Sequence, residues 1–447
     1  MRVRFVFVVF IVTQFSFQAV LAQKLLRPRG FAGFGYRPIT QADVDSLGLS
    51  DNRGVIVNRV LPNTPADRAG FQVGDVLRKY DDRVILDNLQ FVNIYQSYYA
   101  GDEIKVTFMR KGKLDVADLT LAAFPEEKND ALEIEYTSFP SNGVYLRAVI
   151  TSPLKSDRKK LPALFIVSAL GSPRLIASPG YSLQRELAYD VTRAGFRVLR
   201  FEQRGFGDSE GKDFRVMDFN SEVQDNLAAL DYLMHREDVD ENRVFVFGHS
   251  TGGIVAALVA SKTNTAGVIP SCTIGRTYYE RVVETLRLQG ELSGDSKTEI
   301  DETIKKYMNL LVLVARGDSL SHIIHKNPDG ASLVNSRGRI MDDRTAEYWH
   351  QKLNLNLAEI YGKITEPVLI VYGTSDFITQ RACHENIHDF LTSSGNQDVS
   401  LKVIPNLDHA YACASDKKAS FENYKTRNFK KNPEVYEEIV AWLLLHI

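Results

Sequence analysis

The chain has 447 residues, a length that suggests roughly two to three domains at about 150 residues each. With 44% hydrophobic and 25% charged residues, its composition is typical of a globular protein that can bury a large core. The formal net charge is only −2, which argues against a general nucleic-acid or polyanion binder. We therefore expect no nucleic-acid partner.

The N-terminal segment, residues 1–22, has the pattern of a secretory signal. Arg2 and Arg4 precede an apolar run at residues 5–12, and the segment ends in Ala22. The apolar run is shorter than the about 20 residues that a membrane-spanning helix needs. We predict a signal peptide and export to the periplasm or the medium, with no stable membrane span after signal removal. An uncleaved N-terminal anchor is the alternative.

The cysteines and histidines indicate neither a disulfide scaffold nor a metal site. Cys272, Cys383 and Cys413 are few and odd in number, although an exported protein permits disulfides. A bond between Cys383 and Cys413 is one alternative, and three free thiols are the other. No Cys or His spacing matches a metal-ligand pattern, so we expect no metal and no cofactor.

Residues 29–124 contain short strand and turn patterns. A strand is expected at residues 54–60, and a second at residues 103–108, where apolar residues alternate with period two. Between them, a turn at residues 61–65 leads into a short helix at residues 66–70. This series resembles a bacterial-type PDZ domain, on the motifs PNTPADRAG at 62–70 and GDVL at 74–77.

The PDZ resemblance implies a small β-rich module that adds a peptide strand to its sheet edge. Such a module can hold a C-terminal carboxylate on the backbone N–H groups of a Gly-rich loop, which here would be Gly33, Phe34 and Gly35. The alternative is that these glycines only permit a tight turn. A peptide C-terminus is therefore an expected partner of this module.

A polar segment at residues 124–130 contains Pro125 and has no periodicity, so it is predicted to be a linker. From 131 to 447, two extended stretches precede strand-like runs that alternate with helical ones. The strand candidates are 132–139, 144–151, 164–167, 197–201, 244–247, 267–269, 368–372 and 399–404, and the helix candidates are 182–194, 223–235, 254–261 and 434–446. This alternation predicts an α/β fold with a mostly parallel sheet covered on both faces.

The motif Gly248-His249-Ser250-Thr251-Gly252 lies between a predicted strand and a predicted helix. A serine on such a sharp turn projects its hydroxyl above the sheet edge, and the turn needs small residues two positions before and after it. The helix that follows offers free N–H groups and a positive dipole end. Ser250 is therefore the candidate nucleophile; a Gly-rich helix start without chemistry is the alternative.

A serine hydroxyl needs a base to accept its proton, and an imidazole base needs a carboxylate that fixes its tautomer. His409 directly follows the last predicted strand, and Asp376 follows the strand before it. Asp408 adjoins His409 but cannot easily reach the far ring nitrogen, so we rank it below Asp376. His249 is expected to be structural, and the remaining histidines to be packed or exposed.

These three motifs resemble those of an α/β-hydrolase over residues 131–447, with a helical cap inserted at about 275–364. The resemblance implies Ser250 as nucleophile, Asp376 as acid and His409 as base. It also implies two N–H donors for an oxyanion, which we assign to Thr251 and Leu170. The stretch 203–209 resembles a further family segment, with a structural role in which Arg204 and Asp208 pair locally. Cap aromatics are expected either to line the site or to pack against the core, and they are Tyr278, Tyr279, Tyr307 and Trp349.

The function expected from these residues is hydrolysis of a carboxylic ester or related acyl bond through an acyl-enzyme. A peptidase acting on short peptides is the nearest alternative, because the same three residues cleave amides. An alternative of another class is a scaffold in which the PDZ-like module binds a partner and the hydrolase body is inactive. The substrate is expected to be a small ester or peptide.

Overall fold

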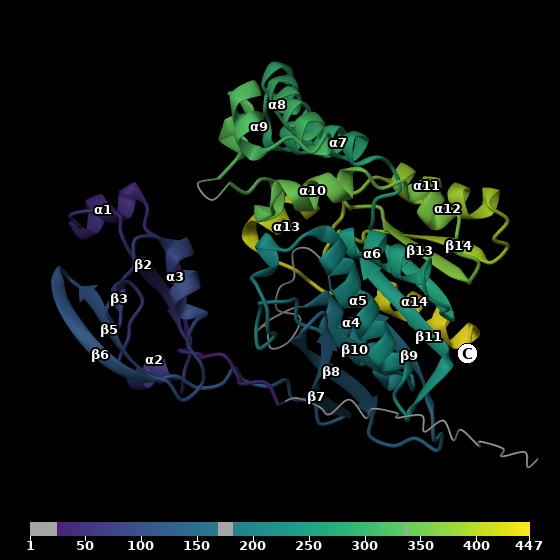
Figure 1. Ribbon diagram of the computed structural model, residues 1–447, viewed down its shortest axis with the longest axis horizontal. Helices are drawn as coiled ribbons and strands as arrows, with labels where there is room; N and C mark the ends of the chain where they lie inside the picture. The colour runs from purple at the N-terminus through teal and green to yellow at the C-terminus, as the bar shows by residue number, and fades with distance from the viewer. Residues whose placement is uncertain (1–24, 169–181, 336–337) are drawn as a thin grey trace, which may run out of the picture.

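The computed structural model describes residues 25–168, 182–335 and 338–447 (Figure 1). The predicted signal peptide at residues 1–22 lies outside these ranges and stays a prediction. Two separate sheets organise the described chain, one within residues 34–120 and one within residues 132–404. Across the described ranges, no helix combines the length and the apolar character that crossing a bilayer requires.

The N-terminal sheet has six antiparallel strands in the order β1-β2-β3-β5-β6, with β4 paired to β3. Its strands are β1 (Phe34–Pro38), β2 (Val55–Val60), β3 (Val76–Tyr80), β4 (Arg83–Val84), β5 (Glu103–Arg110) and β6 (Lys113–Thr120). Its helices are α1 (Gln41–Leu47), α2 (Pro65–Arg68) and α3 (Asn88–Tyr95). The core between sheet and helices is aromatic, with Phe71, Tyr80 and Phe91 buried at its centre.

The C-terminal sheet has eight strands in the order β14-β13-β12-β11-β9-β10-β8-β7. These strands are β7 (Leu132–Ser141), β8 (Val144–Pro153), β9 (Leu161–Ile166), β10 (Arg197–Phe201), β11 (Val239–His249), β12 (Gly267–Ser271), β13 (Val368–Gly373) and β14 (Val399–Ile404). Strand β8 runs antiparallel to both of its neighbours, β7 and β10, so β7 points the same way as the six mutually parallel strands β9–β14. The prediction of a mostly parallel sheet is confirmed.

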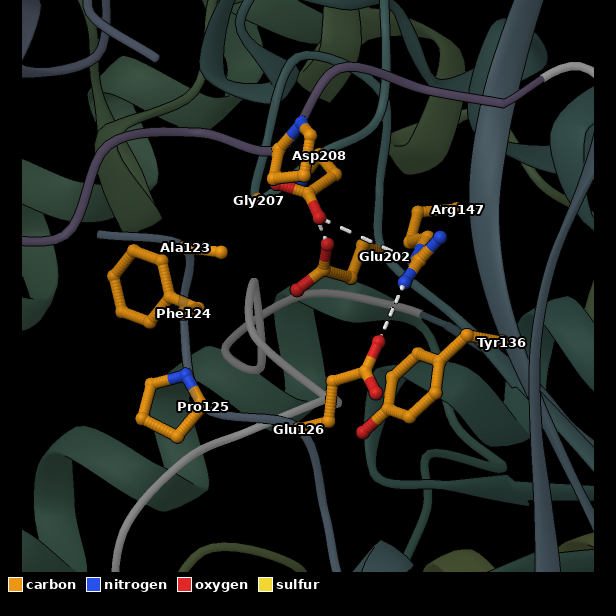
Figure 2. A pocket seen from close by; sticks show the side chains of 10 residues that line it. Ala123, Phe124, Pro125, Glu126, Tyr136, Arg147, Glu202, Gly207 and Asp208 are labelled. Atoms are coloured by element: carbon orange, nitrogen blue, oxygen red, sulfur yellow. Dashed lines mark hydrogen bonds and ion pairs between the residues drawn. The ribbon is translucent and has the colours of Figure 1, made fainter. Parts of the chain in front are cut away.

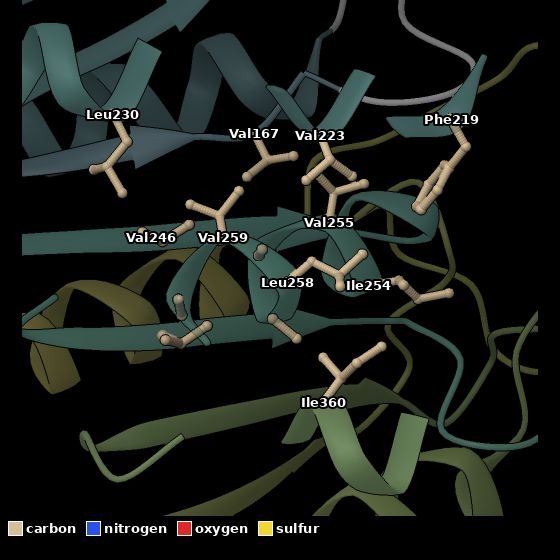
Figure 3. Close-up of a cluster of buried hydrophobic side chains, with 14 of the residues drawn as sticks. Val167, Phe219, Val223, Leu230, Val246, Ile254, Val255, Leu258, Val259 and Ile360 are labelled. Carbon is tan, nitrogen blue, oxygen red and sulfur yellow. The ribbon is translucent and has the colours of Figure 1, made fainter. Parts of the chain in front are cut away.

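Helices cover both faces of this sheet. One face packs on α4 (Leu183–Arg193) and α14 (Pro433–Leu445), and the other on α5 (Phe219–Met234), α6 (Thr251–Ala260) and α12 (Arg381–Ser393). Every residue of α6 is buried. Figure 3 shows its side chains between Val223 of α5 on one side and Ile360 on the other.

A helical cap occupies the chain between β12 and β13. It comprises α7 (Tyr278–Ser293), α8 (Lys297–Ala315), α9 (Leu320–Lys326), η2 (Gly330–Leu333), η3 (Met341–Asp343), α10 (Ala346–Leu353) and α11 (Leu357–Tyr361). In Figure 1, α7, α8 and α9 rise above α10 and away from the sheet. Capping boxes at Thr277 and Ser296 begin α7 and α8, which are the two longest cap helices. The remaining elements are η1 (Phe214–Val216) and α13 (Lys417–Thr426).

The two bodies are bonded to each other where the chain crosses between them. On the way in, the Arg29 N–H donates to the Asp208 carboxylate at 2.7 Å. On the way out, Arg147 lies between Asp208 and Glu126, as Figure 2 shows. The next residue, Glu127, forms a fully buried ion pair with Arg200, whose Nη2 lies 2.8 Å from Glu127 Oε2.

Replacement of Glu127 by Gln should destabilise the C-terminal body strongly, because it removes the carboxylate that forms an ion pair with the buried Arg200 guanidinium. Losing one partner of a buried pair costs about 3–5 kcal/mol. Urea unfolding followed by tryptophan fluorescence measures this loss, since the two tryptophans, Trp349 and Trp442, both lie in that body. The exposed pair Glu359–Lys363 is the control, and Glu359→Gln should cost less than about 0.5 kcal/mol. Equal losses in both variants would contradict the expectation.

Candidate active site

Ser250 occupies the sharp turn that joins β11 to α6. Its backbone is in the left-handed region, with φ 56° and ψ −126°, a conformation that side-chain-bearing residues rarely adopt. The turn closes tightly, because a Cβ placed on Gly248 would lie 2.1 Å from the Gly252 carbonyl oxygen. Thr273, which follows β12, donates from Oγ1 to the Ser250 carbonyl at 2.5 Å and so helps to hold the turn. The sequence therefore forms the strained strand-to-helix turn that its glycines suggest.

The structure brings Ser250, His409 and Asp376 together. His409 Nε2 lies 3.0 Å from Ser250 Oγ, and His409 Nδ1 lies 2.8 Å from Asp376 Oδ2. The three residues follow β11, β13 and β14, which are parallel and therefore end at the same edge of the sheet. This arrangement lets a neutral imidazole donate from Nδ1 to the carboxylate and accept the serine proton at Nε2.

Several donors hold the Asp376 carboxylate in its ionised form. The N–H groups of Ile378 and Thr379 donate to Oδ1 at 2.7 and 2.9 Å, and Thr379 Oγ1 donates to Oδ2 at 2.5 Å. Burial alone would raise the pKa of Asp376, but the His409 charge and these hydrogen bonds outweigh it and lower that pKa to about 2. At neutral pH the residue is a carboxylate aimed at His409.

The Asp408 side chain bonds backbone groups of the turn in which it lies, rather than the His409 ring. Its Oδ1 accepts from the N–H groups of Ala410 and Ala412, both at 2.8 Å. Burial raises the pKa of Asp408 to about 6, although these two N–H donors and His409 oppose the shift. The geometry thus agrees with ranking Asp408 below Asp376.

His249 packs its ring 4.8 Å from the ring of His409. Burial, followed by the nearby His409, lowers its pKa to about 3. A ring that stays neutral at ordinary pH adds no charge beside the His409 imidazole.

Only one of the two predicted oxyanion donors lies within the described residues. Thr251 is the first residue of α6, so its N–H has no acceptor inside the helix. Leu170 lies outside the described residues. The loop that leads to it begins at Ser168, whose N–H donates to Asn226 Oδ1 at 3.0 Å, while Asn226 Nδ2 donates back to the Ser168 carbonyl. Asn226 thereby fixes where this loop leaves β9.

The cap aromatics divide between packing and lining. Tyr278 is buried with its ring 5.0 Å from that of Trp349, and its hydroxyl hydrogen-bonds Thr251. Tyr307 and Trp349 line a pocket of about 230 Å³ between α7, α8 and α10. Tyr279 packs against the main hydrophobic core. The start of α7 therefore lies directly over the nucleophile turn.

The Gly-rich loop of the N-terminal body precedes and begins β1, an edge strand that lies beside α3. Gly33 has φ +91°, and a Cβ there would meet Thr64 at 2.2 Å, so the turn itself requires this glycine. Phe34 packs on the rings of Phe71 and Phe91, and a Cβ at Gly35 would meet Asn58 Oδ1 at 2.7 Å.

A groove of about 400 Å³ runs between this loop, α3 and the C-terminal body. It is lined by Phe31, Phe34, Tyr36, Val92, Tyr95 and Gln96 on one side, by Phe124 of the linker, and by Phe206, Phe214 and Arg215 on the other. The N–H of Ala32, within the loop, donates to Tyr95 Oη at 3.1 Å. The groove is thus a composite of both bodies.

One structural pairing differs from its expectation. Arg204 does not pair with Asp208; its Nε and Nη2 donate to both Asp225 oxygens at 3.0 and 2.5 Å. Asp208 instead receives the Arg29 N–H. The sequence places Arg204 and Asp208 close together, but the fold turns them toward different partners.

Cys272, Cys383 and Cys413 carry free thiols, so the alternative of a Cys383–Cys413 bond does not occur in this structure. Within the described ranges, no cluster of His, Cys, Asp and Glu has the geometry of a metal site.

Thr273, Thr379 and Asn226 escape the sequence analysis, although each hydrogen-bonds the site or its loops. Their only signal is a position shortly after β12, shortly after Asp376 or within α5, and such polar residues occur at many comparable positions.

Each of the two bodies matches a known protein family. Residues 181–413 match the family model described as serine aminopeptidase, S33, and residues 33–121 match that of the PDZ domain. The esterase EstD of Thermotoga maritima is 24% identical over 81% of this chain and 82% of its own length. The quorum-quenching protein AidA of Acinetobacter baumannii is 30% identical over 34% of this chain, which spans about half of that relative.

The N-terminal body has separate relatives. A probable periplasmic serine endoprotease, DegP-like, of Brucella suis is 30% identical over 22% of this chain and 20% of its own length.

Among solved structures, an esterase of Pyrococcus furiosus is similar over 72% of this chain and 96% of its own chain, at a TM-score of 0.44 and 14% identity. The chain belongs to the serine aminopeptidase S33 family of α/β-hydrolases, carries an N-terminal PDZ domain, and is a hydrolase of the serine esterase type.

Proposed function

We propose that the protein cleaves carboxylic esters through a catalytic triad of Ser250, His409 and Asp376. The observation that supports this most directly is the double hydrogen bond of the His409 imidazole, to Ser250 Oγ at one nitrogen and Asp376 Oδ2 at the other. A base placed between a nucleophile and a carboxylate has the geometry that acyl transfer needs.

In the proposed reaction, Ser250 Oγ attacks the ester carbonyl carbon while His409 Nε2 takes the hydroxyl proton. The carbonyl oxygen becomes an oxyanion that accepts from the Thr251 N–H and from a second donor after β9, which we assign to Leu170. The intermediate collapses as His409 protonates the departing alcohol, which leaves an acyl-enzyme on Ser250. Water, deprotonated by His409, then attacks the acyl carbon and releases the acid.

A serine peptidase is the second candidate, because the same three residues can cleave amides. The family model is described as a serine aminopeptidase, and the PDZ domain could bring peptide substrates to the site. The similarity to the esterase EstD covers far more of this chain than the similarity to the DegP-like endoprotease, and we therefore rank ester hydrolysis first.

We also propose that the PDZ domain binds an extended peptide in the groove between β1 and α3. Within the described sheet, β1 pairs on one side with β2, so its other edge is open to a further strand. The relatives of this domain include a protein described as probably periplasmic, which supports the proposal that this chain is also exported.

Removal of either reacting group should abolish ester turnover. Ser250→Ala or His409→Ala should lower kcat on p-nitrophenyl esters by about 10³-fold or more. A fluorophosphonate probe should label the wild type and spare Ser250→Ala. An unlabelled wild type that is folded by circular dichroism would favour the inactive scaffold instead.

Substitution of Asp376 and of Asp408, the two acidic residues near His409, should affect activity very differently. Asp376→Asn should lower kcat by about 10⁴-fold, because an amide cannot stabilise the imidazolium or fix its tautomer. Asp408→Asn should stay within about tenfold of the wild type, since Asp408 bonds only its own turn. Equal losses would argue against Asp376 as the acid.

Because the folded protein raises the pKa of Asp408, the free energy of unfolding should fall as the pH rises. Its unfolded pKa is about 3.9 and its folded pKa about 6, so between these values the unfolded chain releases a proton that the fold retains. The free energy of unfolding should drop by up to about 3 kcal/mol across that window, and Asp408→Asn should lack this drop. Thermal melts from pH 4 to pH 8 test this; parallel curves for both proteins would contradict it.

Peptide binding should depend on the apolar wall of the groove. A charge introduced by Val92→Glu should weaken binding of peptides with apolar C-termini by on the order of tenfold or more, because it places a carboxylate in a wall formed mainly by apolar side chains and repels the carboxylate of the peptide. Val116→Glu, on exposed β6, is the control and should leave binding unchanged. Fluorescence polarisation with a labelled peptide library measures both, and equal binding by all three proteins would remove the groove as the site.

A further inference from the structure

The cap pocket lies next to the nucleophile turn and carries an arginine with no charged partner. The pocket, of about 230 Å³, is lined by Arg281, Val282, Thr285, Leu286, Gln289, Tyr307, Met341, Asp342 and Trp349. Tyr278, whose hydroxyl bonds Thr251, precedes Arg281 by three residues on α7, which is about 4.5 Å along a helix axis. Thr285 Oγ1, further along α7, donates to the Ile378 carbonyl, beside Asp376. One face of α7 thus connects the pocket with both ends of the candidate triad.

Arg281 differs from the other arginines at this end of the cap. Arg276 pairs with Glu284, and Arg287 pairs with Asp301 at 3.0 Å. Within the described residues Arg281 has no ion pair, and its Nε is buried without a hydrogen-bond partner. Its guanidinium carbon lies 5.4 Å from the centre of the Tyr278 ring, a cation–π contact that uses none of its N–H donors. A guanidinium that rests on a ring and keeps a buried N–H without a partner is suited to a carboxylate.

Within the described residues, none of the charged groups around the pocket forms an ion pair with Arg281. Glu222, buried behind the wall, is already paired with Arg344 at 2.5 Å. Lys352 is buried among the rings of Phe219, Tyr278, Tyr348 and Trp349, and its Nζ has no hydrogen-bond partner in the described structure. Asp342 also lines the pocket, and its side chain is exposed.

Burial lowers the pKa of Lys352 to about 7, and Arg281 contributes to the lowering. An anion bound beside Arg281 would offset the surplus of positive charge on this side of the cap.

We propose that Arg281 binds a carboxylate on the acyl part of the substrate, so that the enzyme favours esters of dicarboxylic acids over those of neutral acids. This inference rests on the proposed esterase function. The acyl side is indicated because Tyr278 contacts Thr251, the residue assigned to receive the acyl oxygen. The apolar residues Val282, Leu286 and Met341 line the same pocket as Arg281 and suit the methylene chain between the two ends.

The test compares p-nitrophenyl hexanoate with the mono-p-nitrophenyl ester of adipic acid, which has the same acyl length and one carboxylate. The wild type should have the higher kcat/KM on the adipate half-ester. Arg281→Gln should lower kcat/KM for that ester by about 10- to 100-fold, the range of a charge-assisted hydrogen bond, and leave hexanoate nearly unchanged. Ser250→Ala supplies the spontaneous rate of each ester.

Three further variants keep the test decisive. Arg287→Gln, on the exposed side of α7, should change neither rate beyond the effect of a surface ion pair. Arg281→Lys should retain part of the preference, and Arg281→Glu should reverse it toward a cationic aminoacyl ester. If Arg281→Gln lowers both rates alike, or if the wild type prefers hexanoate, the inference is wrong while the esterase proposal stands. If neither ester is turned over and the fluorophosphonate does not label Ser250, the esterase proposal itself fails.

Discussion

The whole C-terminal body is arranged around one imidazole that must reach two partners from opposite nitrogens. The three residues are more than 30 positions apart along the chain, so only the sheet can bring them together. Parallel strands end at a common edge, and the strand order places β13 and β14 side by side, with β11 two strands from β13. Ser250 spans that gap through its left-handed turn, which the fully buried α6 supports from beneath.

The sequence predicts most where the local pattern and the tertiary environment agree. Strands β10 and β14 match their predicted bounds of residues 197–201 and 399–404. By contrast, α13 is not among the predicted helices, because it buries only Ser420 and therefore has no stripe of apolar residues at helical spacing.

The same division holds for the site. Ser250, Asp376 and His409 could be selected because each directly follows a recognisable strand. Thr379 could not be selected, since its hydrogen bond to Asp376 exists only after the turn has formed. The Arg204–Asp225 pair shows the limit again, because a nearer acid, Asp208, is a reasonable partner in the sequence and is directed elsewhere by the fold. Partner choice among several nearby charges is a tertiary property.

The joint between the two bodies has a consequence for what a bound peptide can do. Hydrogen bonds and a buried ion pair hold both crossings of the chain, at Arg29 and at Glu127. A domain on a long flexible tether raises the effective concentration of its cargo over a broad volume, whereas a domain fixed at both ends delivers its cargo in one direction. If the groove binds a peptide as proposed, the length of peptide that projects beyond the groove, rather than the linker, would set how often its free end meets Ser250.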